Sequence, residues 1–168
     1  MLILGIDPGI ALTGYGLVDS AQNRLHAVEY GCIETPAKMP VEDRLLIIYD
    51  AMCDLLARHK PEEVAIEQLF FNRNVTTAFS VGQARGVMVL ACVRHGLRVR
   101  EYTPLQVKQG IAGYGGADKK QIQTMVRMLL GLAEVPKPDD VADALAIAIT
   151  HAHAVPWQTR VEKRTQNR

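Results

Sequence analysis

The sequence predicts an α/β fold in which helices cover both faces of a central sheet. Short apolar segments typical of buried strands come first, and segments with helical spacing then alternate with further strands. The chain has 168 residues with 48% hydrophobic content, which is enough for one core and too little for two ordinary domains. We therefore expect one domain over residues 1–155, followed by a polar basic tail over 156–168.

The first 35 residues predict three strands. Residues 2–6 form an apolar run that ends at the turn sequence Asp7-Pro8-Gly9. Residues 13–20 and 25–35 are also strand-like, with turn residues between them. This pattern favours an antiparallel meander.

Five helices and two strands follow in the prediction. Pro40 precedes a segment whose apolar residues recur at helical spacing. In order, the elements are a helix over 41–60, a strand over 64–67, a helix over 75–95, a strand over 98–102, a short helix from Thr103-Pro104, a helix capped by Asp118 and ending near 130, and a last helix from Pro138 through 148. The chain after Trp157 is polar and unpatterned, so we expect it to be disordered.

The composition excludes several classes of protein. With 22% charged and 5% aromatic residues, the chain is neither a disordered tail nor a coiled coil. Its longest apolar runs, such as 87–93, are far shorter than a membrane span, and the start MLILGID has no basic leader, so we expect no secretion. The three cysteines, Cys32, Cys53 and Cys92, lack metal-type spacing, which favours a reducing cytoplasm.

Charge is divided unevenly along the chain. Residues 1–68 carry 5 Lys/Arg and 11 Asp/Glu, whereas residues 69–168 carry 14 and 7. The halves therefore have net charges of −6 and +7, although the whole chain has only +1. This division suits a protein that approaches phosphates while its carboxylates hold metal, although an asymmetric solvated surface would look the same.

Four acids stand where a binding crevice is expected. Asp7 and Glu67 each end a predicted strand, and Asp140 and Asp143 share one face at the start of the last helix. Carboxylates without clustered Cys or His favour Mg²⁺ or Mn²⁺ over zinc. If the four converge, two ions about 3.5 to 4 Å apart would activate water and stabilise the leaving oxygen of a phosphodiester.

Each acid also has a structural interpretation that the sequence leaves open. Asp7 would cap its own turn, and Glu67 would pair with Arg73. Asp139 or Asp140 would cap the last helix. The four acids together favour the catalytic interpretation.

Five stretches of this chain resemble the RuvC family of Holliday-junction resolvases and occur in the same order across residues 1–154. They are LGIDPGIALTGYG, AIEQLFFNRN, SVGQARGVMVLA, QVKQ and DDVADALAIAITH. The resemblance implies a ribonuclease H-like fold with a mixed five-stranded sheet, a homodimer, divalent metal, and paired symmetrical nicks across four-way DNA junctions during recombination and repair. It also implies the RuvA-RuvB branch-migration complex as a partner.

The resemblance assigns functional roles to particular positions. Its pattern of two acids with two residues between them selects Asp140 over Asp139, whose place after Pro138 suits an N-cap. Lysines near the cleaved phosphate would neutralise charge that develops in the transition state. The catalytic positions are the carboxylates Asp7, Glu67, Asp140 and Asp143, which would also hold the metal, and the lysines Lys108 and Lys119.

All three phenylalanines lie within ten residues, at Phe70, Phe71 and Phe79. The junction-probing aromatic of the RuvC family matches Phe70, and an exposed ring would stack on an unpaired base. We expect Phe70, Phe71 and Arg73 to contact the substrate, with one of the first two rings pointing inward. Phe79 is expected in the core.

Small residues recur every fourth position in the helix over 75–95, at Ala78, Gly82 and Gly86. Glycine in a helix costs roughly 0.5 to 1 kcal/mol, so close approach of another element should offset it. The partner of a homodimer is favoured, and packing against the chain's own sheet remains a nearly equal alternative.

Three other functions compete with junction cleavage. The segment DPGIALTGYG resembles the first phosphate loop of actin-like ATPases, but the chain has no room for their second subdomain. A ribonuclease H-like nuclease that acts on ribosomal RNA precursor would share the fold and the carboxylates. A junction-binding module without catalysis is disfavoured by the complete set of four acids.

Overall fold

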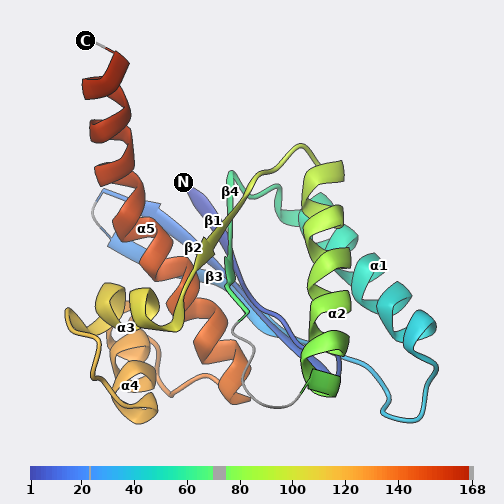
Figure 1. The fold of residues 1–168 in the computed structure, drawn as a ribbon. Coiled ribbons are helices and arrows are strands. Elements are labelled where there is room, and N and C mark those ends of the chain that lie inside the picture. Colours follow the sequence, from blue (N-terminus) through green and yellow to red (C-terminus); the bar gives the residue numbers. More distant parts are fainter. Residues whose placement is uncertain (23, 70–74, 167–168) are drawn as a thin grey trace.

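The computed structural model describes residues 1–22, 24–69 and 75–166, and the elements occur in the predicted order (Figure 1). None of the helices in these ranges combines the length and the hydropathy needed to cross a membrane. The strands are β1 (Leu2–Asp7), β2 (Leu12–Ala21), β3 (Arg24–Glu34), β4 (Glu63–Glu67) and β5 (Val99–Tyr102). The helices are α1 (Val41–His59), α2 (Val75–Arg94), α3 (Pro104–Ala112), α4 (Lys119–Leu129) and α5 (Asp139–Gln166).

The sheet is mixed, with the strand order β3-β2-β1-β4-β5. Strands β1, β2 and β3 form the expected antiparallel meander, and β4 and β5 run parallel to β1. Helices α1 and α2 cover one face around Met52 and Met88, while α3, α4 and α5 cover the other around Val126 and Leu145 (Figure 1). The predicted α/β architecture with helices on both faces is therefore confirmed.

Helix α5 lies against the sheet with no side-chain layer at two points. A Cβ atom on Gly5 of β1 would clash with the carbonyl oxygen of Ala144, and one on Gly14 of β2 would clash with that of Asp140. Only glycine leaves room for the helix backbone at these positions. Because Gly14 pairs in register with Asp7, this contact brings the start of α5 next to the end of β1.

Capping boxes define where α3 and α4 begin. The Thr103 side chain accepts a hydrogen bond from the backbone N–H of Gln106, and the Gln106 side chain accepts one from the backbone N–H of Thr103. Asp118 and Gln121 repeat the arrangement at α4. The cap predicted at Asp118 is confirmed, and the two caps fix the helices that carry the two candidate lysines.

Helix α5 is longer than the sequence predicts. The structure continues it to Gln166, whereas the apolar pattern supports a helix only through residue 148 and a disordered tail from 156. Residues 158–166 are polar but rich in Arg, Glu, Lys and Gln, which have high helix propensity. Apolar periodicity does not detect such a segment.

Candidate active site

Four acids lie near the edge of the sheet where two parallel strands end. Asp7 is the last residue of β1 and Glu67 the last residue of β4, and the pairing of these strands places the two side by side. Asp140 and Asp143 come from the first turns of α5, which the glycine contacts hold over this edge. The site thus draws on two strands and one helix.

A cavity of about 190 Å³ opens at this edge. Its charged lining consists of Glu67 and Asp143 together with Lys108 from α3 and Lys119 from α4. The structure therefore brings both candidate lysines to two of the candidate carboxylates. The remaining lining residues are Pro104, Val107, Ile122 and Ile147.

The carboxyl of Asp7 is strongly perturbed by its surroundings. Burial raises the pKa of Asp7 from 3.8 to about 8, and the charges of Glu67, Asp143 and Asp140 also raise it. The charge of Lys119 acts in the opposite direction. The charged form of Asp7 is therefore disfavoured, first by burial and then by the negative charges of its neighbours.

The neighbouring carboxyls are perturbed in the same direction. Burial raises the pKa of Glu67, as does the charge of Asp143, while a side-chain hydrogen bond with Asp7 lowers it. Burial also raises the pKa of Asp143, against the attraction of Lys119. All three carboxyls therefore favour their protonated form more than a free carboxyl does, chiefly because they are buried.

Lys119 bridges two acids of α5. Its Nζ atom lies 3.2 Å from Asp139 Oδ2 and 3.2 Å from Asp143 Oδ2. The expectation that Asp139 is the N-cap is wrong, because α5 begins at Asp139 itself and its carboxylate pairs with Lys119. The sequence does not reveal this pair because the two residues lie on different helices joined by an irregular segment.

The donor chemistry fits a hard divalent cation. As the side chains stand, no three His, Cys, Asp or Glu residues within the described ranges form a preformed metal site. The carboxyl oxygens nevertheless come from buried acids, and burial and neighbouring negative charges raise the pKa values of Asp7, Glu67 and Asp143. A divalent cation would stabilise the charged form of these carboxylates. The acids that fit this role are Asp7, Glu67, Asp140 and Asp143.

The predicted substrate contacts fall largely outside the part of the chain that the structure describes. These contacts are Phe70, Phe71 and Arg73, none of which belongs to the described residues. The alternative ion pair of Glu67 with Arg73 falls outside the description for the same reason. Phe79 is described, and the expectation that it packs in the core is wrong. Its side chain is 68% exposed because it lies on a face of α2 that no described element covers.

The same face of α2 carries its helix glycines. Apart from the adjacent residues and the nearby backbone of α2 itself, no described atom would lie within 4 Å of a Cβ atom on Gly82 or Gly86. Packing of these glycines against the chain's own sheet, the alternative left open above, is therefore wrong. Leu90 and Val93 continue the face and are 52% and 59% exposed.

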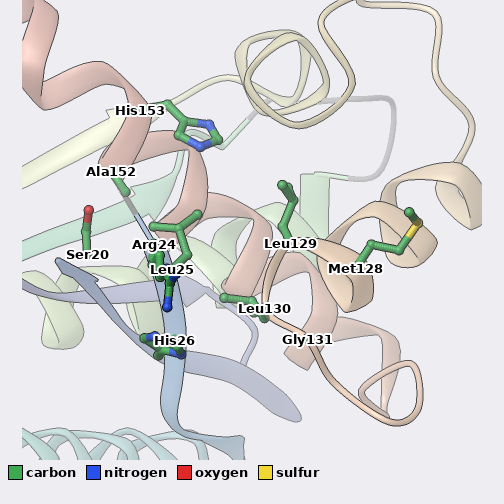
Figure 2. Close-up of a pocket in the computed structure, with 10 residues that line it drawn as sticks. All are labelled: Ser20, Arg24, Leu25, His26, Met128, Leu129, Leu130, Gly131, Ala152 and His153. Atoms are coloured by element: carbon green, nitrogen blue, oxygen red, sulfur yellow. The ribbon is translucent and has the colours of Figure 1, made fainter. Parts of the chain in front are cut away.

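A larger cavity of about 760 Å³ lies away from these carboxylates. Figure 2 shows its lining, which comes from the end of β2, the start of β3, the end of α4 and the middle of α5, and includes Arg24, Leu130 and His153. It contains none of the candidate catalytic residues. The candidate catalytic residues are therefore associated with the smaller of the two cavities.

Comparison with known proteins identifies the family. A family model described as "Crossover junction endodeoxyribonuclease RuvC" matches residues 3–151. The chain belongs to the RuvC family. The RuvC of Desulfitobacterium hafniense (strain DSM 10664 / DCB-2) is 63% identical over 155 residues, which are 92% of this chain and 94% of that protein. The RuvC of Clostridioides difficile (strain 630) is 52% identical over 167 residues, or 99% and 96% of the two chains.

A solved RuvC also matches the structure. Thermus thermophilus RuvC in complex with Holliday junction substrate superposes with a TM-score of 0.87 at 37% identity, over 94% of this chain and 96% of that one. The match to RuvC confirms the ribonuclease H-like α/β fold. It gives no support to the alternative of a nuclease for ribosomal RNA precursor.

Proposed function

We propose that this RuvC family member is an endonuclease that resolves four-way DNA junctions by paired, symmetrical nicks. The observation that carries the proposal is the cavity at the sheet edge, where Glu67 and Asp143 face Lys108 and Lys119. Phosphodiester cleavage requires acids that hold metal next to cationic side chains that contact the phosphate. The similarity to a RuvC solved with Holliday junction substrate supports the same substrate here.

Metal dependence is a property of this nuclease family, and the acids of this chain suit it. We assign Asp7, Glu67, Asp140 and Asp143 as ligands for two Mg²⁺ ions per site, with Mn²⁺ as a substitute. When bound, the metal activates water and stabilises the leaving oxygen. The oxygen donors of the four acids support this assignment, as do the raised pKa values of Asp7, Glu67 and Asp143.

The other side chains of the cavity have separate roles. Lys108 and Lys119 bring positive charge to the cleaved phosphate, where it offsets the charge that develops in the transition state. Val107, Ile122 and Ile147 line the same cavity with apolar surface. Electrostatic interactions are stronger beside such a wall than in open water.

The test of this function is cleavage of a synthetic mobile four-way junction. With Mg²⁺, we expect two nicks at symmetry-related positions that leave ligatable 5′-phosphate ends, and no cutting of a linear duplex of the same sequence. EDTA should abolish the nicks, and added Mg²⁺ should restore them. Nicking that persists in EDTA would contradict a metal-dependent mechanism.

Paired nicks require two active sites, and the uncovered face of α2 supports a homodimer. Phe79, Gly82, Gly86, Leu90 and Val93 lie on one side of this helix at intervals of three or four residues. The large residues among them are exposed, and the glycines leave room for a second backbone. A second copy of the chain would cover this apolar stripe.

The variant Gly86→Arg should convert the dimer to a monomer without harming the fold. A Cβ atom at this position would meet no neighbouring segment in the single chain, and arginine favours the helix more than glycine does. Light scattering should show the monomer mass, and junctions should receive single rather than paired nicks. Met128→Arg, at a 67% exposed position on the opposite face of the sheet, is the control and should remain dimeric. A dimeric Gly86→Arg variant would remove α2 from the interface.

Phe70 is proposed to stack on unpaired bases at the crossover, with Phe71 and Arg73 as neighbouring contacts. Phe70→Ala should slow nicking of an intact junction by roughly 5- to 150-fold, because stacking on a base contributes about 1 to 3 kcal/mol. The unfolding midpoint should stay near that of the wild type. Normal junction nicking, or a large loss of stability, would instead place the ring in the core.

We also propose the RuvA-RuvB complex as a partner and the cytoplasm as the compartment. Family membership supports the partner. The three cysteines are free thiols, which suits a reducing compartment.

A further inference from the structure

Lys119 is held at a defined place on the rim of the cavity. It is the first residue of α4, directly after the Asp118 cap, so its backbone is anchored. Its ammonium group lies 3.2 Å from both Asp139 and Asp143, which are four residues apart on one face of α5. The two acids differ in position, because only Asp143 lines the cavity.

Asp139 is also held in place from α4. Its carboxylate accepts hydrogen bonds from Lys119 and from Gln123, which follows one helical turn later. Asp139 is 57% exposed at its side chain, compared with 35% for Asp143. Lys119 therefore has one carboxylate partner inside the site and one outside it, at equal distances.

A divalent cation among the carboxylates would compete with Lys119 for Asp143, since both bind the same oxygen atoms. We propose that Asp139 is a positioning residue that retains Lys119 at the rim of the cavity when Asp143 binds the metal ion. This inference rests on the proposed function, in which Asp143 is a metal ligand. Lys119 then gives up its contact with Asp143 but keeps its ion pair with Asp139. It therefore remains within reach of the phosphate.

The direct test is binding of Mn²⁺ measured by calorimetry on the dimer without DNA. In Asp139→Asn, Lys119 has only Asp143 as a partner and competes more strongly for it, so the Mn²⁺ dissociation constant should rise about two- to fivefold. Asp54→Asn on α1 removes the same charge from an exposed position and should leave Mn²⁺ binding unchanged.

A double-mutant cycle distinguishes retention of Lys119 by Asp139 from simple attraction between Asp139 and the cation. In a Lys119→Met background the competitor is gone, so adding Asp139→Asn should change the dissociation constant by less than about 1.5-fold. An equal loss in both backgrounds would overturn the proposal. If the wild type nicks junctions and binds Mn²⁺ but the cycle shows no coupling between Asp139 and Lys119, only the positioning role of Asp139 is wrong. A wild type that binds no Mn²⁺ would contradict the proposed function as well.

Discussion

Asp7→Asn is expected to lose junction nicking by more than about 100-fold while it still binds the junction. Loss of a hydrogen-bonding partner behind a metal ligand already costs about 10- to 100-fold, and loss of a ligand's charge should exceed that. Binding should survive because the basic second part of the chain supplies contacts to phosphates. Gel-shift titrations in EDTA and single-turnover nicking in Mg²⁺ measure the two properties separately.

The stability of this variant distinguishes a catalytic from a structural carboxylate. Asparagine has the shape of aspartate without its charge, so Asp7→Asn should be at least as stable as the wild type at pH 8 without metal. Asp54→Asn serves as the charge-matched control and should nick normally. Parallel loss of binding, nicking and stability would show that Asp7 only supports the β1 turn.

The second large effect is a fall in stability of the metal-free protein as pH rises from about 4 to about 8. Asp7 has a pKa of about 8 when folded and 3.8 as its ordinary value, so between these limits the folded state binds more protons than the unfolded state. Stability then falls with pH, by up to about 1.4 kcal/mol per pH unit for one such group. The raised pKa values of Glu67 and Asp143 act in the same direction.

Urea unfolding in EDTA between pH 6.5 and 8 isolates this effect. His151, buried and hydrogen-bonded to Tyr102 at 2.8 Å, has a pKa that burial lowers, so its contribution increases stability with rising pH, mainly below its ordinary value of 6.5. Added Mg²⁺ should stabilise the protein more at pH 8 than at pH 6.5, because it displaces the proton from Asp7. Nicking at a fixed, limiting Mg²⁺ concentration should rise over the same range.

The Asp7→Asn variant is the control for the pH series. Its stability in EDTA should change much less between pH 6.5 and 8 than that of the wild type. Identical profiles for the two proteins would show that Asp7 is ionised in the folded state throughout this range.

The order of elements and the position of the acids were accessible from the sequence because both depend on local signals. An apolar run that ends in an acid predicts a strand with its carboxylate at the sheet edge, as for Asp7 and Glu67. The cap at Asp118 follows from residues within one turn. Family resemblance then suggested the proposed roles of Lys108 and Lys119, which local patterns do not give.

The remaining features depend on contacts between distant segments. Pairing of Lys119 with Asp139 requires knowing how α4 lies on α5, and no spacing in the sequence encodes it. Exposure of Phe79 depends on which side of α2 faces the sheet, and the helix is apolar on several sides. The contacts of Gly5 and Gly14 with α5 likewise appear only when the three segments are assembled.

The glycine contacts bear on which ions the site would accept. Side chains between a helix and a sheet change rotamer when a neighbour moves, but two backbones in contact shift only together. The spacing between the start of α5 and the end of β1 therefore has no adjustable layer, and only carboxylate torsions would adapt to an ion. Mg²⁺ requires near-octahedral oxygens at about 2.0 to 2.1 Å, whereas Ca²⁺ accepts looser sites at about 2.3 to 2.6 Å. A preference for the smaller ion would thus depend on Gly5 and Gly14, although neither residue has a side chain that could bind an ion.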